Sequence, residues 1–125
     1  MELAAEIDQL DPATAVVTVT GPLRLSPDLQ TVNYALQQLV AGGVTRMVVD
    51  LTDCPYVDSA GLGTLIHTFG LLSERHGMFR LCAVNQRIED LIVMTHTDAL
   101  LHRDQDRETS LAALPELPEI PELET

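Results

Sequence analysis

Lysine is absent from the sequence, and seven arginines face nineteen acidic residues, so the formal net charge is −12. A chain with this charge repels nucleic acid phosphates and anionic membrane surfaces, which makes other proteins the expected partners. Half of the charge lies in residues 104–125, where seven acidic residues accompany only Arg107.

Cysteine and aromatic residues are also scarce. Two cysteines, Cys54 and Cys82, are too few for a disulfide scaffold and lack metal-ligand spacing, so we expect no metal and no cofactor. Cys82 stands in an apolar run and is predicted to be a core residue, whereas Cys54 is predicted to lie in a loop. A redox role for the pair stays open. With aromatic residues at 3%, the core must be built from aliphatic side chains.

No apolar run approaches the roughly 20 residues that a membrane-spanning helix needs. The first residues, 1–6, contain no basic region of the kind that opens a signal peptide, and we therefore expect a cytoplasmic protein. Hydrophobic residues make up 46% of the 125 residues, which indicates one globular domain with a real core.

Strand and helix patterns alternate along residues 3–103. A first strand and a second one are joined by a loop at 9–14 that is too short for a crossover, so this pair is predicted to be antiparallel. The alternation predicts an α/β domain with a mostly parallel sheet of four to five strands, an antiparallel edge strand and about four flanking helices. Strands are expected at 3–8, 15–20, 44–51, 78–84 and 99–103, and helices at 26–41, 59–76, 85–94 and 108–114.

The last eleven residues, 115–125, differ in kind from the domain at 1–114. Proline recurs there at every third position, which forbids a helix and favours a polyproline II conformation. We expect a flexible, solvated acidic Pro-Glu tail. The alternative is a docking stripe for a partner or a second copy, formed by Leu117, Ile120 and Leu123.

The most informative segment follows the apolar strand at 44–51. A loop at 52–57 leads into Asp58-Ser59-Ala60-Gly61-Leu62-Gly63, where a helix begins. Ser59 is thus predicted to lie at or just before a helix N-terminus, where free N–H groups and the helix dipole suit an added phosphate.

Two interpretations of this segment compete. Ser59 is equally suited to be an ordinary N-cap, worth roughly 1 kcal/mol. However, Gly61 and Gly63 are poor helix formers, each costing about 1 kcal/mol against alanine, so their presence indicates close backbone approach. Lacking side chains, they leave access for a kinase or another partner, while Leu62 begins the buried face of the helix.

The segment from Val48 to Ile66, with D-S-A-G-L-G at its centre, resembles the signature of anti-sigma factor antagonists, and the elements over 3–103 resemble the STAS fold. The resemblance implies that Ser59, directly after Asp58, is phosphorylated by an ATP-using anti-sigma factor of the histidine-kinase-like type. It also implies that a serine phosphatase removes the phosphate. The unphosphorylated form would bind the anti-sigma factor, which frees a sigma factor for transcription.

One departure from the family pattern concerns the partner surface. The family usually has Gly-x-Leu-Asp after the second strand, whereas this chain has Gly21-Pro22-Leu23-Arg24. This loop should lie at the same end as Ser59, because functional loops gather at the carboxyl edge of parallel strands. The predicted partner-binding residues are Pro22, Arg24, Leu25, Asp58, Ala60, Gly61, Leu62 and Gly63.

Two other functions compete with this interpretation. The same fold serves as a partner subunit in lipid-transporter or stress-signalling assemblies without the sigma switch. Alternatively, Ser59 could be the nucleophile of an enzyme, but the G-x-S-x-G pattern is absent. His67, two turns further along the helix, is too far away to be its base. We therefore predict a binding protein and not an enzyme.

Overall fold

The structure is a computed structural model, and it describes residues 2–114. The predicted acidic tail, 115–125, lies outside the described residues. Within the described range, strands and helices alternate after an initial hairpin. The elements are β1 (Ala4–Asp11), β2 (Thr14–Thr20), α1 (Pro27–Ala41), β3 (Arg46–Asp53), α2 (Ser59–Glu74), β4 (Met78–Cys82), α3 (Gln86–Met94), β5 (His102–Asp104) and α4 (Arg107–Ala113).

The five strands form one sheet in the order β1-β2-β3-β4-β5. β1 is antiparallel to β2, and the other neighbouring strands are parallel. This arrangement confirms the predicted α/β fold with its antiparallel edge strand. β1 is longer than predicted because its pairing with β2 continues to Asp11 and Thr14. A two-residue turn, Pro12-Ala13, therefore replaces the loop expected at 9–14.

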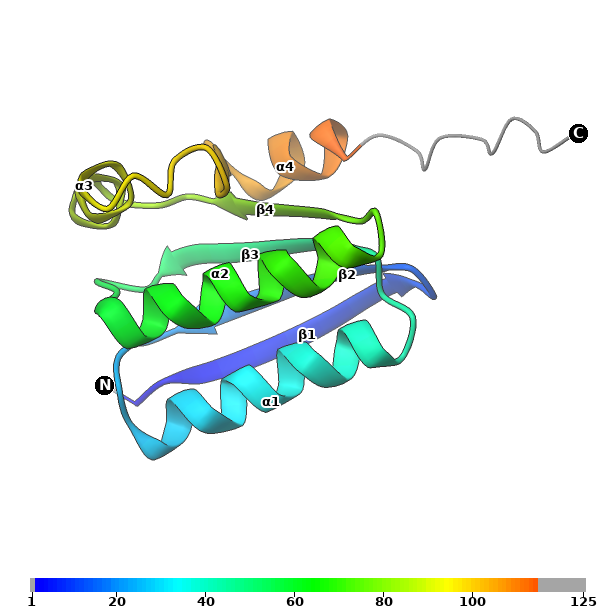
Figure 1. The fold of residues 1–125 in the computed structure, drawn as a ribbon, viewed down its shortest axis with the longest axis horizontal. Helices are drawn as coiled ribbons and strands as arrows, with labels where there is room; N and C mark the ends of the chain where they lie inside the picture. Colours follow the sequence, from blue (N-terminus) through cyan, green and yellow to red (C-terminus); the bar gives the residue numbers. More distant parts are fainter. Residues whose placement is uncertain (1, 115–125) are drawn as a thin grey trace, which may run out of the picture.

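The sheet separates two layers of helices. α1 and α2 pack side by side on one face, and α4 lies on the other (Figure 1). Because successive side chains of a strand point to opposite faces, neighbouring strand residues belong to different cores. Val17, Val49 and Leu81 pack with α1, α2 and α3, whereas Val16, Val48 and Cys82 pack with Leu111 and Leu114 at the end of α4.

Several element ends differ from the sequence prediction by a few residues. β4 stops at Cys82, before the predicted end at Val84, because Ala83 adopts a left-handed backbone with φ 59°. β5 lies at 102–104 and not at 99–103, since only these residues pair with β4. β3 is shifted to 46–53, and the last helix begins at Arg107 after its N-cap, Asp106.

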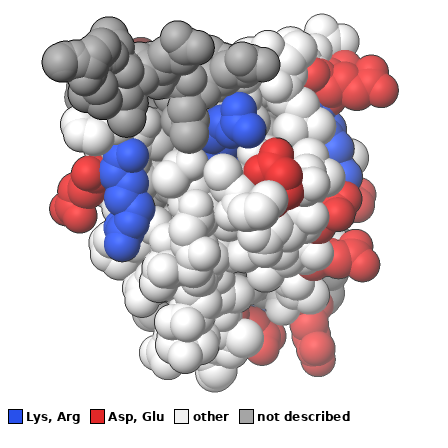
Figure 2. All heavy atoms as spheres, turned by 90° about the vertical axis from the view of Figure 1, so that its right-hand side faces the viewer, with Lys and Arg blue, Asp and Glu red and all other residues white. Residues whose placement is uncertain are grey.

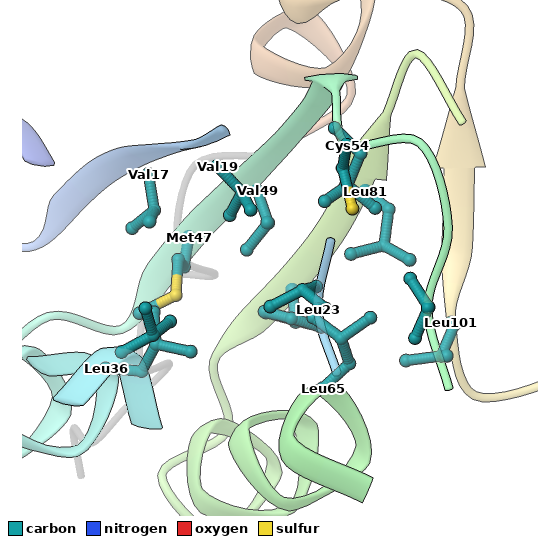
Figure 3. Packing of buried hydrophobic residues seen from close by; sticks show 14 of the residues in the cluster. Val17, Val19, Leu23, Leu36, Met47, Val49, Cys54, Leu65, Leu81 and Leu101 are labelled. Atoms are coloured by element: carbon teal, nitrogen blue, oxygen red, sulfur yellow. The ribbon is translucent and has the colours of Figure 1, made fainter. Parts of the chain in front are cut away.

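The helix predicted from Ser26 and Pro27 begins as expected. The hydroxyl of Ser26 accepts a hydrogen bond from the Leu29 amide at 3.2 Å, and Pro27 occupies the first helical position. The loop before α1 is held down by Leu23, which is only 1% exposed. Figure 3 shows Leu23 lying between the sheet and Leu65 of α2. The start of α1, the start of α2 and the loop at 21–25 are therefore packed on a common core.

Acidic side chains outnumber basic ones in this chain, and their distribution over the surface is uneven. Figure 2 shows the end of the domain opposite to the α2 N-terminus, where acidic side chains gather along one side. Many of the arginines are engaged within the chain. Ion pairs join Arg46 to Asp11, Arg80 to Asp104, Arg103 to Glu89 and Arg107 to Asp50.

Candidate functional site

Ser59 is the first residue of α2, and Asp58 is the N-cap. The Oδ1 atom of Asp58 accepts a hydrogen bond from the Gly61 amide at 2.8 Å, which satisfies one of the free donors of the first turn. The interpretation of Ser59 as the N-cap is therefore wrong. Ser59 is exposed, and its hydroxyl forms no hydrogen bond with any residue of 2–114. This hydroxyl is free to react or to contact a partner.

Asp58 also joins α2 to the loop that follows β2. Its Oδ2 atom accepts a hydrogen bond from the Leu25 amide at 2.9 Å, and its own amide donates to the Leu23 carbonyl at 3.0 Å. Leu23 also forms a short parallel bridge with Val57. The sequence predicted that the loop at 21–25 and Ser59 share one end of the domain. The structure goes further, because hydrogen bonds fix the two segments side by side.

The carboxyl group of Asp58 is ionised at neutral pH. Partial burial raises its pKa, but hydrogen bonds from the amides of Gly61 and Leu25 and the positive charge of Arg24 outweigh that effect. The net result is a pKa below the ordinary value of 3.8. A carboxylate thus lies directly beside Ser59, with Arg24 close enough to act on its charge.

The two glycines of the motif have different surroundings. A Cβ atom on Gly61 would lie only 2.1 Å from the carbonyl oxygen of Leu23, so this glycine permits close packing within the chain. A Cβ atom on Gly63 would meet nothing within 4 Å, so this position is open. The sequence predicts that both glycines leave room for a partner. Only Gly63 has open space beside it, whereas the space beside Gly61 is filled by the Leu23 main chain.

Three of the predicted partner-binding residues lie inside the domain. Gly61 and Pro22 are buried, and Leu62 is 6% exposed, in the core. These residues support the loop and the helix start from inside the domain, and their part in partner binding stays a prediction. The others face outward, with Arg24, Leu25, Ser59 and Gly63 exposed and Asp58 and Ala60 half-buried.

A second layer of contacts supports the loop before Ser59. The Asn85 side chain caps α3 and also donates a hydrogen bond to the Pro55 carbonyl at 2.9 Å. The guanidinium of Arg87 lies over the Tyr56 ring, 4.5 Å from its centroid. These contacts between α3 and the loop at 54–57 were not predicted. The sequence shows the helix start at Asn85 but not which loop it meets.

Neither cysteine presents a thiolate to solvent. Cys82 is fully buried, as predicted, and Cys54 is 1% exposed although it follows the end of β3. Burial raises the pKa of the Cys54 thiol, and burial together with the Asp50 charge raises the pKa of Cys82 to about 12. Since reactivity follows the thiolate, neither residue fits a redox site.

The surroundings of Ser59 do not resemble a hydrolase site. His67 is exposed, eight residues further along α2, which corresponds to about 12 Å along the helix axis. Within residues 2–114, no group of three or more His, Cys, Asp or Glu side chains could hold a metal ion. Nor is any helix in this range long and apolar enough to cross a membrane. The site offers an exposed hydroxyl, a carboxylate and a neighbouring cation.

Comparison with known protein families gives a match to the STAS domain over residues 4–110. This range covers the sheet, the first three helices and the Ser59 segment, and the chain belongs to the STAS domain family. No curated protein sequence matches the chain.

Several solved structures of the same fold are anti-sigma factor antagonists. A putative antagonist from Thermotoga maritima has a TM-score of 0.80 and 15% identity, covering 88% of this chain and 93% of its own. An antagonist from Mycobacterium paratuberculosis has a TM-score of 0.78 and 22% identity, covering 92% and 96%. The antagonist SpoIIAA in its unphosphorylated form has a TM-score of 0.75 and 14% identity, covering 90% and 100%. The Bacillus protein SpoIIAA in its phosphorylated form has a TM-score of 0.70 and 14% identity, covering 87% and 97%.

Proposed function

We propose that this protein is an anti-sigma factor antagonist that binds an anti-sigma factor while Ser59 is unphosphorylated and loses it when Ser59 is phosphorylated. The observation that carries the proposal is the exposed Ser59 hydroxyl in the first turn of α2, beside a loop fixed by Asp58. This hydroxyl has no hydrogen-bond partner within residues 2–114. Several proteins of the same fold are anti-sigma factor antagonists, and the structure of one of them, SpoIIAA, is known in both phosphorylation states, which supports the proposal.

The partner in this scheme is a cytoplasmic anti-sigma factor that is also a serine kinase of the histidine-kinase-like ATPase type. The kinase transfers the γ-phosphoryl group of ATP to Oγ of Ser59, breaking the bond to ADP and releasing the hydroxyl proton. A serine phosphatase then hydrolyses the phosphate ester. This chain performs no catalysis itself, because its contribution is the acceptor hydroxyl and the surface around it.

Phosphorylation should weaken the complex through charge. The phosphate adds about −1.5 to −2 charges beside the Asp58 carboxylate. A partner surface that covers a small hydroxyl would then have to desolvate a dianion, and a loss of about 3–4 kcal/mol weakens binding more than a hundredfold. The fold should survive, since the α2 N-terminus stabilises a nearby anion by roughly 0.3–1 kcal/mol while Asp58 opposes it.

The proposed contact surface surrounds Ser59. Leu25, which is 73% exposed, supplies an apolar contact, and Arg24 supplies a cation where the family usually has an acid. Ala60 and Gly63 continue the surface along the first turn of α2. Because Arg24 replaces an acid, the partner should carry a complementary acidic group there, which distinguishes it from the partners of related proteins.

Titration of four forms of the protein against the anti-sigma partner tests the proposal. Wild type and Ser59→Ala should bind tightly, and Ser59→Ala should resist phosphorylation. Phosphorylated protein and Ser59→Glu should stay folded and bind at least a hundredfold more weakly. Equal affinities across the set, or phosphate found on another residue in cells, would contradict the proposal. Capture of a transporter ATPase in place of an anti-sigma factor would favour the other STAS role.

A further inference from the structure

We infer that Arg24 binds the phosphate group of phosphorylated Ser59, so that the chain itself supplies a cation for its phosphoserine. The inference rests on the proposed function, because it takes Ser59 as the phosphorylated residue. It concerns a residue at which this chain departs from the family pattern, which usually has an acid at this position.

The position of Arg24 is fixed by hydrogen bonds on both sides of it. The carbonyl of Leu23 accepts from the Asp58 amide at 3.0 Å, and the amide of Leu25 donates to the Asp58 carboxylate at 2.9 Å. Arg24 therefore belongs to a short segment that is bonded, before and after it, to the residue next to Ser59. Because Leu23 is buried in the core and Arg24 is exposed, the Arg24 side chain lies on the solvent side of this segment.

The guanidinium of Arg24 is available for a new partner. It acts on the Asp58 carboxylate through its charge, yet it forms no hydrogen bond or ion pair with any residue of 2–114. Arg87, the other arginine close to the Ser59 loop, is stacked on Tyr56. Arg75 is exposed but caps the opposite end of α2. Arg24 is thus the arginine that combines proximity to Ser59 with a free guanidinium.

A phosphate on Ser59 would attract this guanidinium more strongly than the Asp58 carboxylate does, because it carries about −1.5 to −2 charges. The planar guanidinium can also donate two parallel hydrogen bonds to the phosphate oxygens. The Asp58 carboxylate is a poorer acceptor for such a pair, because its two oxygens already accept from the amides of Gly61 and Leu25. Arg24 would then turn from Asp58 towards the phosphate. Phosphorylation would therefore change the surface twice, by adding charge at Ser59 and by engaging Arg24.

The inference can be tested without any kinase, by incorporating phosphoserine at position 59 during translation. The second ionisation of the phosphate, which ordinarily has a pKa near 6, is followed by ³¹P NMR during a pH titration. A neighbouring cation favours the dianion and lowers this pKa. We expect the phosphate pKa in the otherwise native protein to lie at least about half a pH unit below that of Arg24→Gln. Arg24→Lys, which keeps the charge, should restore most of the difference.

Arg87→Gln is the matched control, since it removes one positive charge from the same end of the domain without touching the loop at 21–25. It should leave the phosphate pKa near that of the native protein. Equal phosphate pKa values for native protein and Arg24→Gln would overturn the inference. An equally large shift in Arg87→Gln would also overturn it, because the effect would then be a diffuse field and not a contact.

The two hypotheses fail in different ways. If Ser59 is never phosphorylated in cells, the proposed function fails, while the incorporated phosphoserine still reports whether Arg24 binds it. If phosphorylation abolishes partner binding but Arg24→Gln leaves the phosphate pKa unchanged, the proposed function stands and the Arg24 contact fails.

Discussion

Gly61 of α2 and Leu23 of the loop after β2 are in such close contact that a Cβ atom on Gly61 would lie 2.1 Å from the Leu23 carbonyl oxygen. The obstacle is main chain, held by the hydrogen bond between the Asp58 amide and that same carbonyl. A side chain cannot be accommodated here by a change of rotamer. The loop or the helix would have to move.

Gly61→Ala should therefore destabilise the domain by about 1–3 kcal/mol, the usual cost of overpacking, despite the better helix propensity of alanine. Chemical denaturation would measure the change. Gly63→Ala is the control in the same turn, where a Cβ atom meets nothing, and it should be neutral or stabilising by up to about 1 kcal/mol. Equal stabilities for the two variants would contradict the assigned role of Gly61.

Asp58 should make stability depend on pH in the acid range. Its pKa is lowered in the folded state, so its contribution is present above the unfolded value of about 3.8 and is lost as the pH falls through the lower, folded value. Asp58→Asn keeps an oxygen that can accept from the Gly61 amide or the Leu25 amide, but not from both. The free energy of unfolding, measured by chemical denaturation, should therefore fall by about 1 kcal/mol at neutral pH. The difference in unfolding free energy between wild type and Asp58→Asn should become smaller below about pH 4, because Asp58 itself then becomes protonated.

Asp106→Asn is a suitable control for that experiment. Asp106 is the N-cap of α4, and its carboxylate accepts a hydrogen bond from the Thr109 amide, which asparagine can also accept. This variant should stay close to wild type at neutral pH. A loss as large as that of Asp58→Asn would show that the bond to Leu25 adds nothing.

Reversal of charge at Arg24 should alter partner choice. Arg24→Asp restores the kind of residue that the family pattern has, and it should change the affinity for the cognate partner by about 1–3 kcal/mol if the contact is desolvated. Arg75→Asp makes the same change of net charge at the far end of α2 and should have little effect. A dissociation constant that is unchanged in Arg24→Asp would place the interface elsewhere.

Removal of residues 115–125 should leave the domain folded. The last residues of the second core, Leu111 and Leu114, remain in this truncation, and the acidic Pro-Glu composition of the removed part favours solvation. The melting temperature should stay within a few degrees. A truncation that removes residues 111–125 is the comparison, because it exposes Val16 and Val48 to solvent. This second truncated protein should have a clearly lower melting temperature. Loss of cooperative unfolding in the shorter truncation would show that the tail packs on the domain.

Much of the fold could be predicted because it follows from local patterns. Runs of β-branched residues such as 15–20 indicate strands, and Ser26-Pro27 marks a helix start by its own chemistry. The position of Ser59 after a buried strand could be predicted in the same way. The ends of the strands were harder to predict, because β4 ends where Ala83 adopts a left-handed backbone and β5 is bounded by its pairing with β4.

The contacts between loops could not be predicted, because periodicity reports which face is buried and not which loops meet. The hydrogen bond from Leu25 to Asp58 joins residues 33 positions apart. The need for glycine at 61 likewise depends on where the Leu23 carbonyl lies. Glycine at 61 does indicate a close approach of backbone, but only the structure shows that the Leu23 carbonyl is the neighbour.

The burial of both cysteines makes the protein convenient for site-specific labelling. Cys54 and Cys82 are almost inaccessible and protonated, so they should react slowly with maleimides. A cysteine introduced at the open position of Gly63 would be the readily modified thiol in the chain, one turn of helix from Ser59. A fluorophore placed there would report partner binding and phosphorylation directly, without removal of the native cysteines from the core.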